Sequence, residues 1–210
     1  ISQNSNYQSI SLVYLETARK TTNQELTFTV AAAGSATFRI KISQIECSSI
    51  SKAPTDCLQY FTGASGTVTS LNYPTVLLSG IQYTICTRKE EGYCGISWAP
   101  TASTSPDTFD LDDTLITDGN NFEADASDAY ILIPGSLYSE YGGNSLSQES
   151  ASTAANMDDT SGAVDSFGIP NRLIVVSHAA TSGTNTALGF SLVYRLLPCS
   201  YIPRTFVAPA

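Results

Sequence analysis

The sequence predicts an all-β protein: an antiparallel β-sandwich with a partial second module at the N-terminus. Helical periodicity is scarce, whereas strand-like alternation of apolar and polar residues is common and is interrupted by Gly, Pro and Asn. Apolar residues make up 42% of the chain and charged residues only 14%, a balance that suits secreted β proteins with a sizeable core. Short strands without intervening helices favour a sandwich.

The expected strands follow the chain in order. The first two form a hairpin around the turn "AAAGSA", where Ile40 and Ile42 share one face with Phe38. Trp98, in a later strand, is expected in the core. A loop rich in Ser, Gly, Ala and Asp is expected at 136–168, with a short helix around 150–157. The expected strands are 26–30, 37–45, 66–73, 81–88, 95–100, 129–134, 172–177 and 189–197.

An internal repeat relates the two ends of the chain. Residues 26–47 and 173–199 each contain an apolar strand, a turn of small residues, a strand that begins with Phe, and a final Cys nine residues after that Phe. Both are therefore interpreted as the closing hairpin of the same type of module. The equivalent pairs are Phe38 and Phe190, Ile40 and Leu192, Ile42 and Tyr194, and Cys47 and Cys199.

The repeat predicts the domain organisation. A lone hairpin cannot bury its apolar face and is marginal in water, so Phe38, Ile40 and Ile42 need a cover. The cover is expected from the second module or from a separate chain that carries the missing strands. The predicted parts are the C-terminal part of an upstream module at 1–47, a linker at 48–56, a complete module at 57–199 and a tail at 200–210.

The charge distribution excludes some function classes. The net charge of −9 argues against nucleic-acid binding, which needs clustered Lys and Arg. Residues 92–171 hold 13 of the 19 acidic residues and no Lys or Arg, which predicts either a solvated face or a cation-binding edge. No apolar run approaches the roughly 18 residues of a membrane span. A membrane-spanning helix is therefore not expected.

No motif predicts catalysis. His178 is the only histidine, so a Ser-His-Asp or Cys-His site would have to use it. It lies in "VVSHAATSG", where no nucleophile motif accompanies it, and we expect a loop histidine. The segment "GASG" has no Lys or helix to make a phosphate site. We expect that the protein is not an enzyme.

Four motifs, taken in order, resemble the CUB domain family. "CLQYFTGASGTVTSLNYP" resembles its opening, "YTICTRKEEGYCGI" the next strand with a second Cys, "DAYILIPG" the central Asp-Tyr motif and "GFSLVYRLLPC" the closing strand. The resemblance covers Cys57 to Cys199 and is strongest to tandem CUB-like secreted proteins of invertebrates. Leu71 stands where the family usually has Pro, and the Cys before the central motif is absent. The resemblance implies a jelly-roll-like, CUB-like sandwich.

The five cysteines leave fifteen disulfide arrangements open when one Cys stays unpaired. The family resemblance selects Cys57 with Cys86, and Cys94 with Cys199 then follows. Cys47 remains. Because its equivalent in the repeat is Cys199, its partner is expected in the missing front half of the upstream module, as an inter-chain disulfide. The alternative is a free buried thiol.

The resemblance also bears on calcium, which many CUB domains bind through a Glu and two Asp from separate loops. Asp128 matches the central Asp, while Asp110, Asp112 and Asp113 compete for the Glu position. The other Asp would fall near Ser177 and His178, where no carboxylate stands. Asp128 and Asp112 are the candidate ligands, but so few fall short of the six to eight oxygens that calcium takes. We expect no cofactor and no calcium dependence.

These expectations combine into one function and one alternative. The resemblance implies a secreted, extracellular, non-enzymatic CUB-like module for protein–protein interaction. Its expected partners are extracellular proteins and another polypeptide, the N-terminal part of the same precursor. The alternative is a processed structural subunit of an extracellular assembly, coat or fibre, joined through Cys47 and strand pairing.

Overall fold

The computed structural model describes residues 12–17, 25, 27, 40–102, 108–111, 129–143, 146, 162–177 and 187–201. Within these ranges the regular structure consists of strands, and none of the described residues belongs to a helix long and apolar enough to cross a membrane. The strands are β1 (Cys57–Phe61), β2 (Ser65–Thr69), β3 (Gln82–Thr87), β4 (Tyr93–Pro100), β5 (Phe109–Asp110), β6 (Tyr130–Leu132), β7 (Glu140–Gly142), β8 (Val164–Ser166), β9 (Arg172–Val176) and β10 (Gly189–Pro198).

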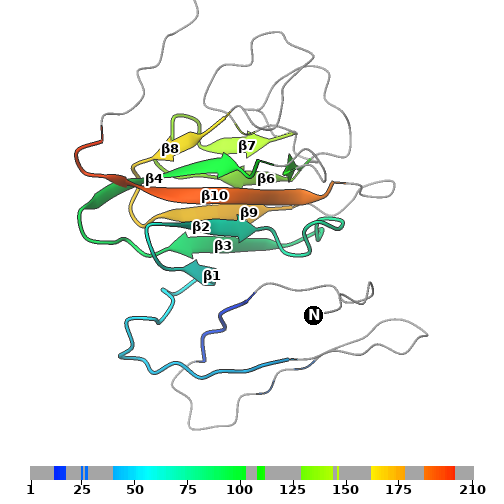
Figure 1. The fold of residues 1–210 in the computed structure, drawn as a ribbon. Coiled ribbons are helices and arrows are strands. Elements are labelled where there is room, and N and C mark those ends of the chain that lie inside the picture. Colours follow the sequence, from blue (N-terminus) through cyan, green and yellow to red (C-terminus); the bar gives the residue numbers. More distant parts are fainter. Residues whose placement is uncertain are drawn as a thin grey trace, which may run out of the picture.

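The strands form two sheets that pack as a sandwich (Figure 1). One sheet has the order β1-β3-β9-β6-β7, and the other has the order β2-β10-β4-β8 with β5 added to β10. This confirms the predicted all-β sandwich. One pair departs from the antiparallel expectation: β1 and β3 are parallel. They run in the same direction because β2, which lies between them in sequence, belongs to the opposite sheet.

The core lies between the two sheets, and β10 contributes most of one side. Phe190, Leu192 and Tyr194 alternate along this strand and are at most 1% exposed. Trp98 of β4 lies beside Tyr194 and is fully buried, which confirms its predicted place in the core. Gly66 of β2 leaves room for the Tyr194 ring, since an added Cβ would lie 2.7 Å from Tyr194 Cε1. The phenol hydroxyl of Tyr194 reaches the carbonyl oxygen of Thr62 at the end of the sandwich, at 3.2 Å.

Several predicted boundaries differ from the structure. The strand expected at 66–73 ends at Thr69, because the chain turns at Asn72, where φ is 75°. Beyond β2, the Leu71 amide donates to the Tyr83 hydroxyl at 2.9 Å. The loop expected at 136–168 contains two short strands, β7 and β8, which the sequence analysis missed. The helix expected around 150–157 lies outside the described residues.

The described N-terminal residues lie beside the sandwich, below β1 in Figure 1. Residues 40–45, which the sequence predicts as part of a strand, are not in a strand; their side chains are exposed. Residues 26 and 28–39, which include Phe38 and most of the predicted hairpin, lie outside the described residues. The interpretation of the matching residues 173–199 as a closing hairpin is wrong, because β9 and β10 belong to opposite sheets and do not pair with each other. The N-terminal segment reaches the sandwich at Tyr14, whose amide donates to the Leu58 carbonyl at 2.7 Å. The Tyr14 ring meets Tyr60 edge-on at 6.0 Å between centroids.

Candidate protein-interaction site

Two disulfides connect neighbouring strands and give the sandwich a fixed frame. Cys57 bonds to Cys86, which ties the edge strand β1 to β3 with a Cα–Cα distance of 5.7 Å. Cys94 bonds to Cys199, which ties β4 to the end of β10 across 105 residues of sequence. These are the two pairs that the resemblance implies. Cys47 is exposed, and its thiol is free in the structure.

The candidate calcium ligands Asp128 and Asp112 lie outside the described residues, as does His178. Ser177, at the position where the family would place another carboxylate, is buried, and its hydroxyl donates to the Leu78 carbonyl at 2.6 Å. Among the described residues, no three His, Cys, Asp or Glu side chains gather into a group that could hold a metal ion. The described part of the chain therefore does not supply a metal-binding set.

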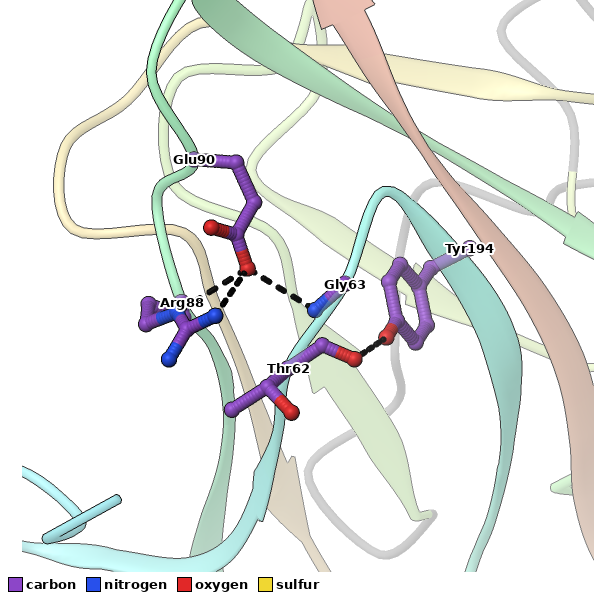
Figure 2. Close-up of polar contacts among 5 residues, drawn as sticks. All are labelled: Thr62, Gly63, Arg88, Glu90 and Tyr194. Carbon is purple, nitrogen blue, oxygen red and sulfur yellow. Dashed lines mark hydrogen bonds and ion pairs between the residues drawn. The ribbon is translucent and has the colours of Figure 1, made fainter. Parts of the chain in front are cut away.

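At one end of the sandwich, a polar network joins the β1–β2 turn to the β3–β4 turn (Figure 2). The Glu90 carboxylate oxygen Oε1 accepts hydrogen bonds from the Gly63 amide and from Arg88 Nε, both at 2.9 Å. Arg88 Nη2 lies 2.9 Å from the same oxygen. Beside this network, the Tyr194 hydroxyl donates to the Thr62 carbonyl. Hydrogen bonds from side chains of both sheets thus connect the β1–β2 turn to the β3–β4 turn and to β10 at this end of the sandwich.

The electrostatics of this network explain why it stays ionised. The hydrogen bond from Arg88 lowers the pKa of the Glu90 carboxyl, and the hydrogen bond from the Gly63 amide lowers it further. Burial raises the pKa of the Tyr194 phenol, and the nearby charge of Glu90 adds to the effect. One carboxylate oxygen of Glu90 thus accepts from groups of both turns, which joins the β1–β2 turn to the β3–β4 turn.

Two hydrogen-bonded loops carry three exposed apolar side chains, Leu137, Phe167 and Ile169, which we call the loop patch. Their exposed fractions are 52%, 41% and 67%. Leu137 lies in the β6–β7 loop, and the other two lie in the β8–β9 loop. The amide of Phe167 donates to the Gly135 carbonyl at 3.1 Å, which joins the two loops. Large exposed apolar groups on ordered loops are typical of protein-binding surfaces.

Close backbone packing holds the loop patch in place. Gly168 lies against the β6–β7 loop, since an added Cβ would lie 2.4 Å from the Pro134 carbonyl oxygen. The Ser166 hydroxyl donates to that same carbonyl at 2.6 Å. The Phe167 ring covers Gly95 of β4 and stacks on Tyr201 at 6.5 Å between centroids. The Tyr201 hydroxyl in turn donates to Asp165 Oδ2 at 2.8 Å. The backbone that carries the exposed side chains is therefore closely packed and hydrogen-bonded.

The sequence analysis did not single out the loop patch or the Glu90 network. A signal for the patch was present in "FGIP", because two large apolar residues stand beside Gly and Pro in a segment that is otherwise small and polar. The Glu90 network left no comparable signal. "TRKEEG" contains three further charged residues beside Glu90, and only the fold shows which of them meets the Gly63 amide.

A family model described as "Animal CUB domain" matches residues 54–197. The chain belongs to this family. The CUB domain is a module of protein–protein interaction, so the family agrees with an interaction role for the described surfaces. The match begins three residues before Cys57, where β1 starts. No curated protein matches the chain.

Among solved structures, the chain is similar to the CUB1-EGF-CUB2 domains of rat MASP-1, with 15% identity and a TM-score of 0.41 over 66% of this chain and 42% of that one. It is also similar to the CUB1-EGF-CUB2 domain of human MASP-1/3, with 13% identity and a TM-score of 0.39 over 69% and 48%. The chain thus spans less than half the length of each. A third structure, the MASP-1 CUB2 domain bound to Ca2+, has 22% identity and a TM-score of 0.35 over 65% and 96%.

Proposed function

We propose that this chain is a secreted, extracellular, non-enzymatic protein whose CUB domain binds other proteins through the loop patch. The observation that carries the proposal is the exposure of Phe167 and Ile169 on loops that the sandwich holds rigidly. Two disulfides within one domain support an extracellular location, because disulfides persist in oxidising compartments. The family supports a role in interaction.

Protein is the partner class that the chemistry of the patch favours. The three side chains of the loop patch are aliphatic or aromatic and offer no hydrogen-bonding group. They suit an apolar surface of another folded protein, with Tyr201 adding an aromatic ring beside Phe167. Anchors of this type, set in a polar surround, commonly supply most of the binding free energy at an interface.

A paired-variant capture experiment tests the proposal. The wild-type chain and the double variant Phe167→Ser with Ile169→Ser are immobilised and exposed to extracellular proteins of the source tissue. The matched control is Val76→Ser with Leu78→Ser, which removes two apolar side chains of 43% and 42% exposure from a different loop. We expect the patch variant to lose at least about tenfold of the captured partner, equivalent to one or two lost anchors. Equal capture by the two double variants would contradict the proposal.

We also propose that folding does not depend on calcium. The hydroxyl of Ser177 is engaged with Leu78, and its position supplies no carboxylate. The sequence match therefore gives two candidate carboxylates, Asp128 and Asp112, fewer than the six to eight oxygens that calcium takes. A thermal melt with calcium, and again with a chelator, checks this. We expect the same melting temperature in both, whereas a rise of several degrees with calcium would show binding to the folded state.

The alternative function, a processed structural subunit of an extracellular assembly, coat or fibre, depends on residues 40–47 rather than on the loop patch. Ile42 is 74% exposed, and the Cys47 thiol is exposed and free. An assembly subunit would use these positions for strand pairing and for a disulfide with another chain. The loop-patch variants leave both untouched, so the two functions can be tested separately.

A further inference from the structure

In the complete domain, β10 lies between two strands of its own sheet. It pairs with β2 on one edge and with β4 on the other. Leu192 and Tyr194 point into the sandwich and are 0% and 1% exposed, while Leu197 is 5% exposed. Cys199 follows the strand and bonds to Cys94 of β4. The last strand of this module therefore has two paired neighbours, and one of them carries the cysteine to which Cys199 bonds.

Among the residues that the structure describes, the equivalent positions near the N-terminus have none of these neighbours. Counted back from Cys47, the residues equivalent to Leu192, Tyr194 and Leu197 are Ile40, Ile42 and Ile45. Their exposed fractions are 44%, 74% and 42%. Cys47 itself is exposed and free where Cys199 is bonded. The apolar side chains at these equivalent positions are thus buried in β10 and exposed in residues 40–45.

The CUB domain of this chain cannot supply the missing neighbours. Both edges of β10 are filled, by β2 and β4, and β4 is paired in turn with β8. Cys94, the residue that would bond to Cys47, is already bonded to Cys199. Among the described residues, the contact between the N-terminal segment and the domain is a small cluster around Tyr14, Ala53 and Tyr60 beside the Cys57–Cys86 bond. This cluster leaves Ile40, Ile42 and Ile45 uncovered.

We propose that residues 40–47 are the closing strand of a second CUB domain, whose β2- and β4-equivalent strands lie on a polypeptide encoded upstream, and that Cys47 forms a disulfide with this polypeptide. In the complete domain, the strands that flank the closing strand precede it in sequence, as β2 and β4 precede β10. The upstream part is therefore the occupant that the topology selects. Its cysteine lies at the position equivalent to Cys94.

The chemistry of the bond is an ordinary thiol oxidation. The Cys47 thiol and the partner thiol lose two protons and two electrons as the S–S bond forms. A disulfide oxidant of the secretory route accepts them and is released as two thiols. Strand pairing places the two thiols together first, as the pairing of β10 with β4 does for Cys199 and Cys94.

Disulfide mapping of the protein from its natural source tests the proposal. The protein is alkylated before unfolding, digested without reduction, and analysed for the peptide that contains Cys47. We expect this peptide to be bonded to a peptide from outside residues 1–210, and that partner peptide to carry its Cys at the start of a largely apolar segment, as "YCGISWAP" does. An alkylated Cys47, a bond to another cysteine of residues 1–210, or a Cys47–Cys47 bond between two copies would each overturn the proposal.

Hydrogen exchange adds a second readout that does not depend on the cysteine. In the isolated 210-residue chain, the amides of residues 40–45 should exchange at nearly the unfolded rate, because these residues are in no strand of the structure. In the natural protein, the same amides should exchange at least about a hundredfold more slowly, as those of a paired strand do. Equal rates in the two samples would overturn the proposal. Neither outcome affects the loop patch, so failure here is distinguishable from failure of the proposed function.

Discussion

The β10 strand and residues 40–47 carry equivalent sequence positions in opposite surroundings. Leu192 is fully buried and Ile40 is 44% exposed, although both are branched aliphatic residues of the same size. Tyr194 is 1% exposed and Ile42 is 74% exposed. Cys199 is bonded and Cys47 is free. The two segments differ in their neighbours far more than in their own residues.

The comparison shows where the stability of a sheet strand comes from. Alternation of apolar residues creates a potential inner face, but burying that face is worth about 1.5–3 kcal/mol per large side chain only once another layer covers it. β10 has this layer and two paired neighbours. Within the part of the chain that the structure describes, residues 40–45 have neither, and they are in no strand. The pattern is thus necessary but not sufficient for a strand.

The largest expected difference between the two segments concerns their cysteines. Cys94→Ser with Cys199→Ser opens a closure of 105 residues, and we expect it to lower the free energy of unfolding by about 4–5 kcal/mol, since a long loop gains most entropy when it is released. Cys47→Ser in the isolated chain should change it by less than about 0.5 kcal/mol, as exposed residues without partners usually do. Urea unfolding measures both. A comparable loss from Cys47→Ser would show that the thiol has a partner within residues 1–210.

The second expected difference concerns the equivalent aliphatic residues. Leu192→Ala should lower the free energy of unfolding by about 2–5 kcal/mol, because it removes a fully buried side chain from the core. Ile40→Ala should have almost no effect in the isolated chain, because its side chain is already substantially exposed. Chemical unfolding under identical conditions gives the two values. Similar losses of unfolding free energy would mean that Ile40 is buried in solution, and the contrast between β10 and residues 40–47 would then be wrong.

The sequence predicted the sandwich because its strands alternate strongly and its motifs keep the family order. β3, β9 and β10 lie close to their predicted ranges, since each carries several consecutive inward apolar residues. β5, β7 and β8 were missed because they have only two or three residues each. Such short strands exist through pairing with distant neighbours, as Trp98 pairs with Val164. Periodicity within a few residues cannot reveal that pairing.

The candidate sites were less predictable than the fold. The pairing of Cys57 with Cys86 followed from a family resemblance and not from spacing alone. The two loops of the loop patch are joined by the hydrogen bond between Gly135 and Phe167, which are 32 residues apart in sequence. No local sequence pattern connects these two positions. The parallel alignment of β1 with β3 likewise depends on β2 crossing to the other sheet. Properties of this kind arise from the topology and become visible only in three dimensions.

A smaller effect is expected from the anchor that follows β2 in the complete domain. The Tyr83 hydroxyl accepts the Leu71 amide at 2.9 Å in a buried site, and burial raises the pKa of Tyr83 to about 12. Tyr83→Phe leaves that amide without its acceptor, and we expect a loss of about 1–3 kcal/mol. Tyr93→Phe, at a less buried tyrosine, is the control and should have little effect in the same unfolding assay.

The dependence of the free energy of unfolding on alkaline pH gives an independent check that the Tyr83 phenol is buried. Because the folded-state pKa is raised, the unfolded chain loses its proton first, and stability should fall as pH rises from about 10 towards about 12. Tyr83→Phe should remove this part of the pH dependence. An alkaline limb that is unchanged in Tyr83→Phe would show that another tyrosine causes it.

The smallest expected effect concerns Glu90, which joins two turns at one end of the complete domain (Figure 2). The Arg88 and Gly63 hydrogen bonds lower its folded-state pKa, so the unfolded state binds a proton first as the solution becomes acidic. The stabilisation by Glu90 is therefore present above the ordinary glutamate pKa and is lost as pH falls through the lower folded-state value. We expect Glu90→Gln to melt at a lower temperature than wild type at pH 7 and at the same temperature in strong acid. Its exposed neighbour Glu91 provides the control, because Glu91→Gln removes an equal charge and leaves the Gly63 and Arg88 hydrogen bonds of Glu90 in place. If the difference between wild type and Glu90→Gln did not shrink with falling pH, the carboxylate would not be the group that holds the two turns together.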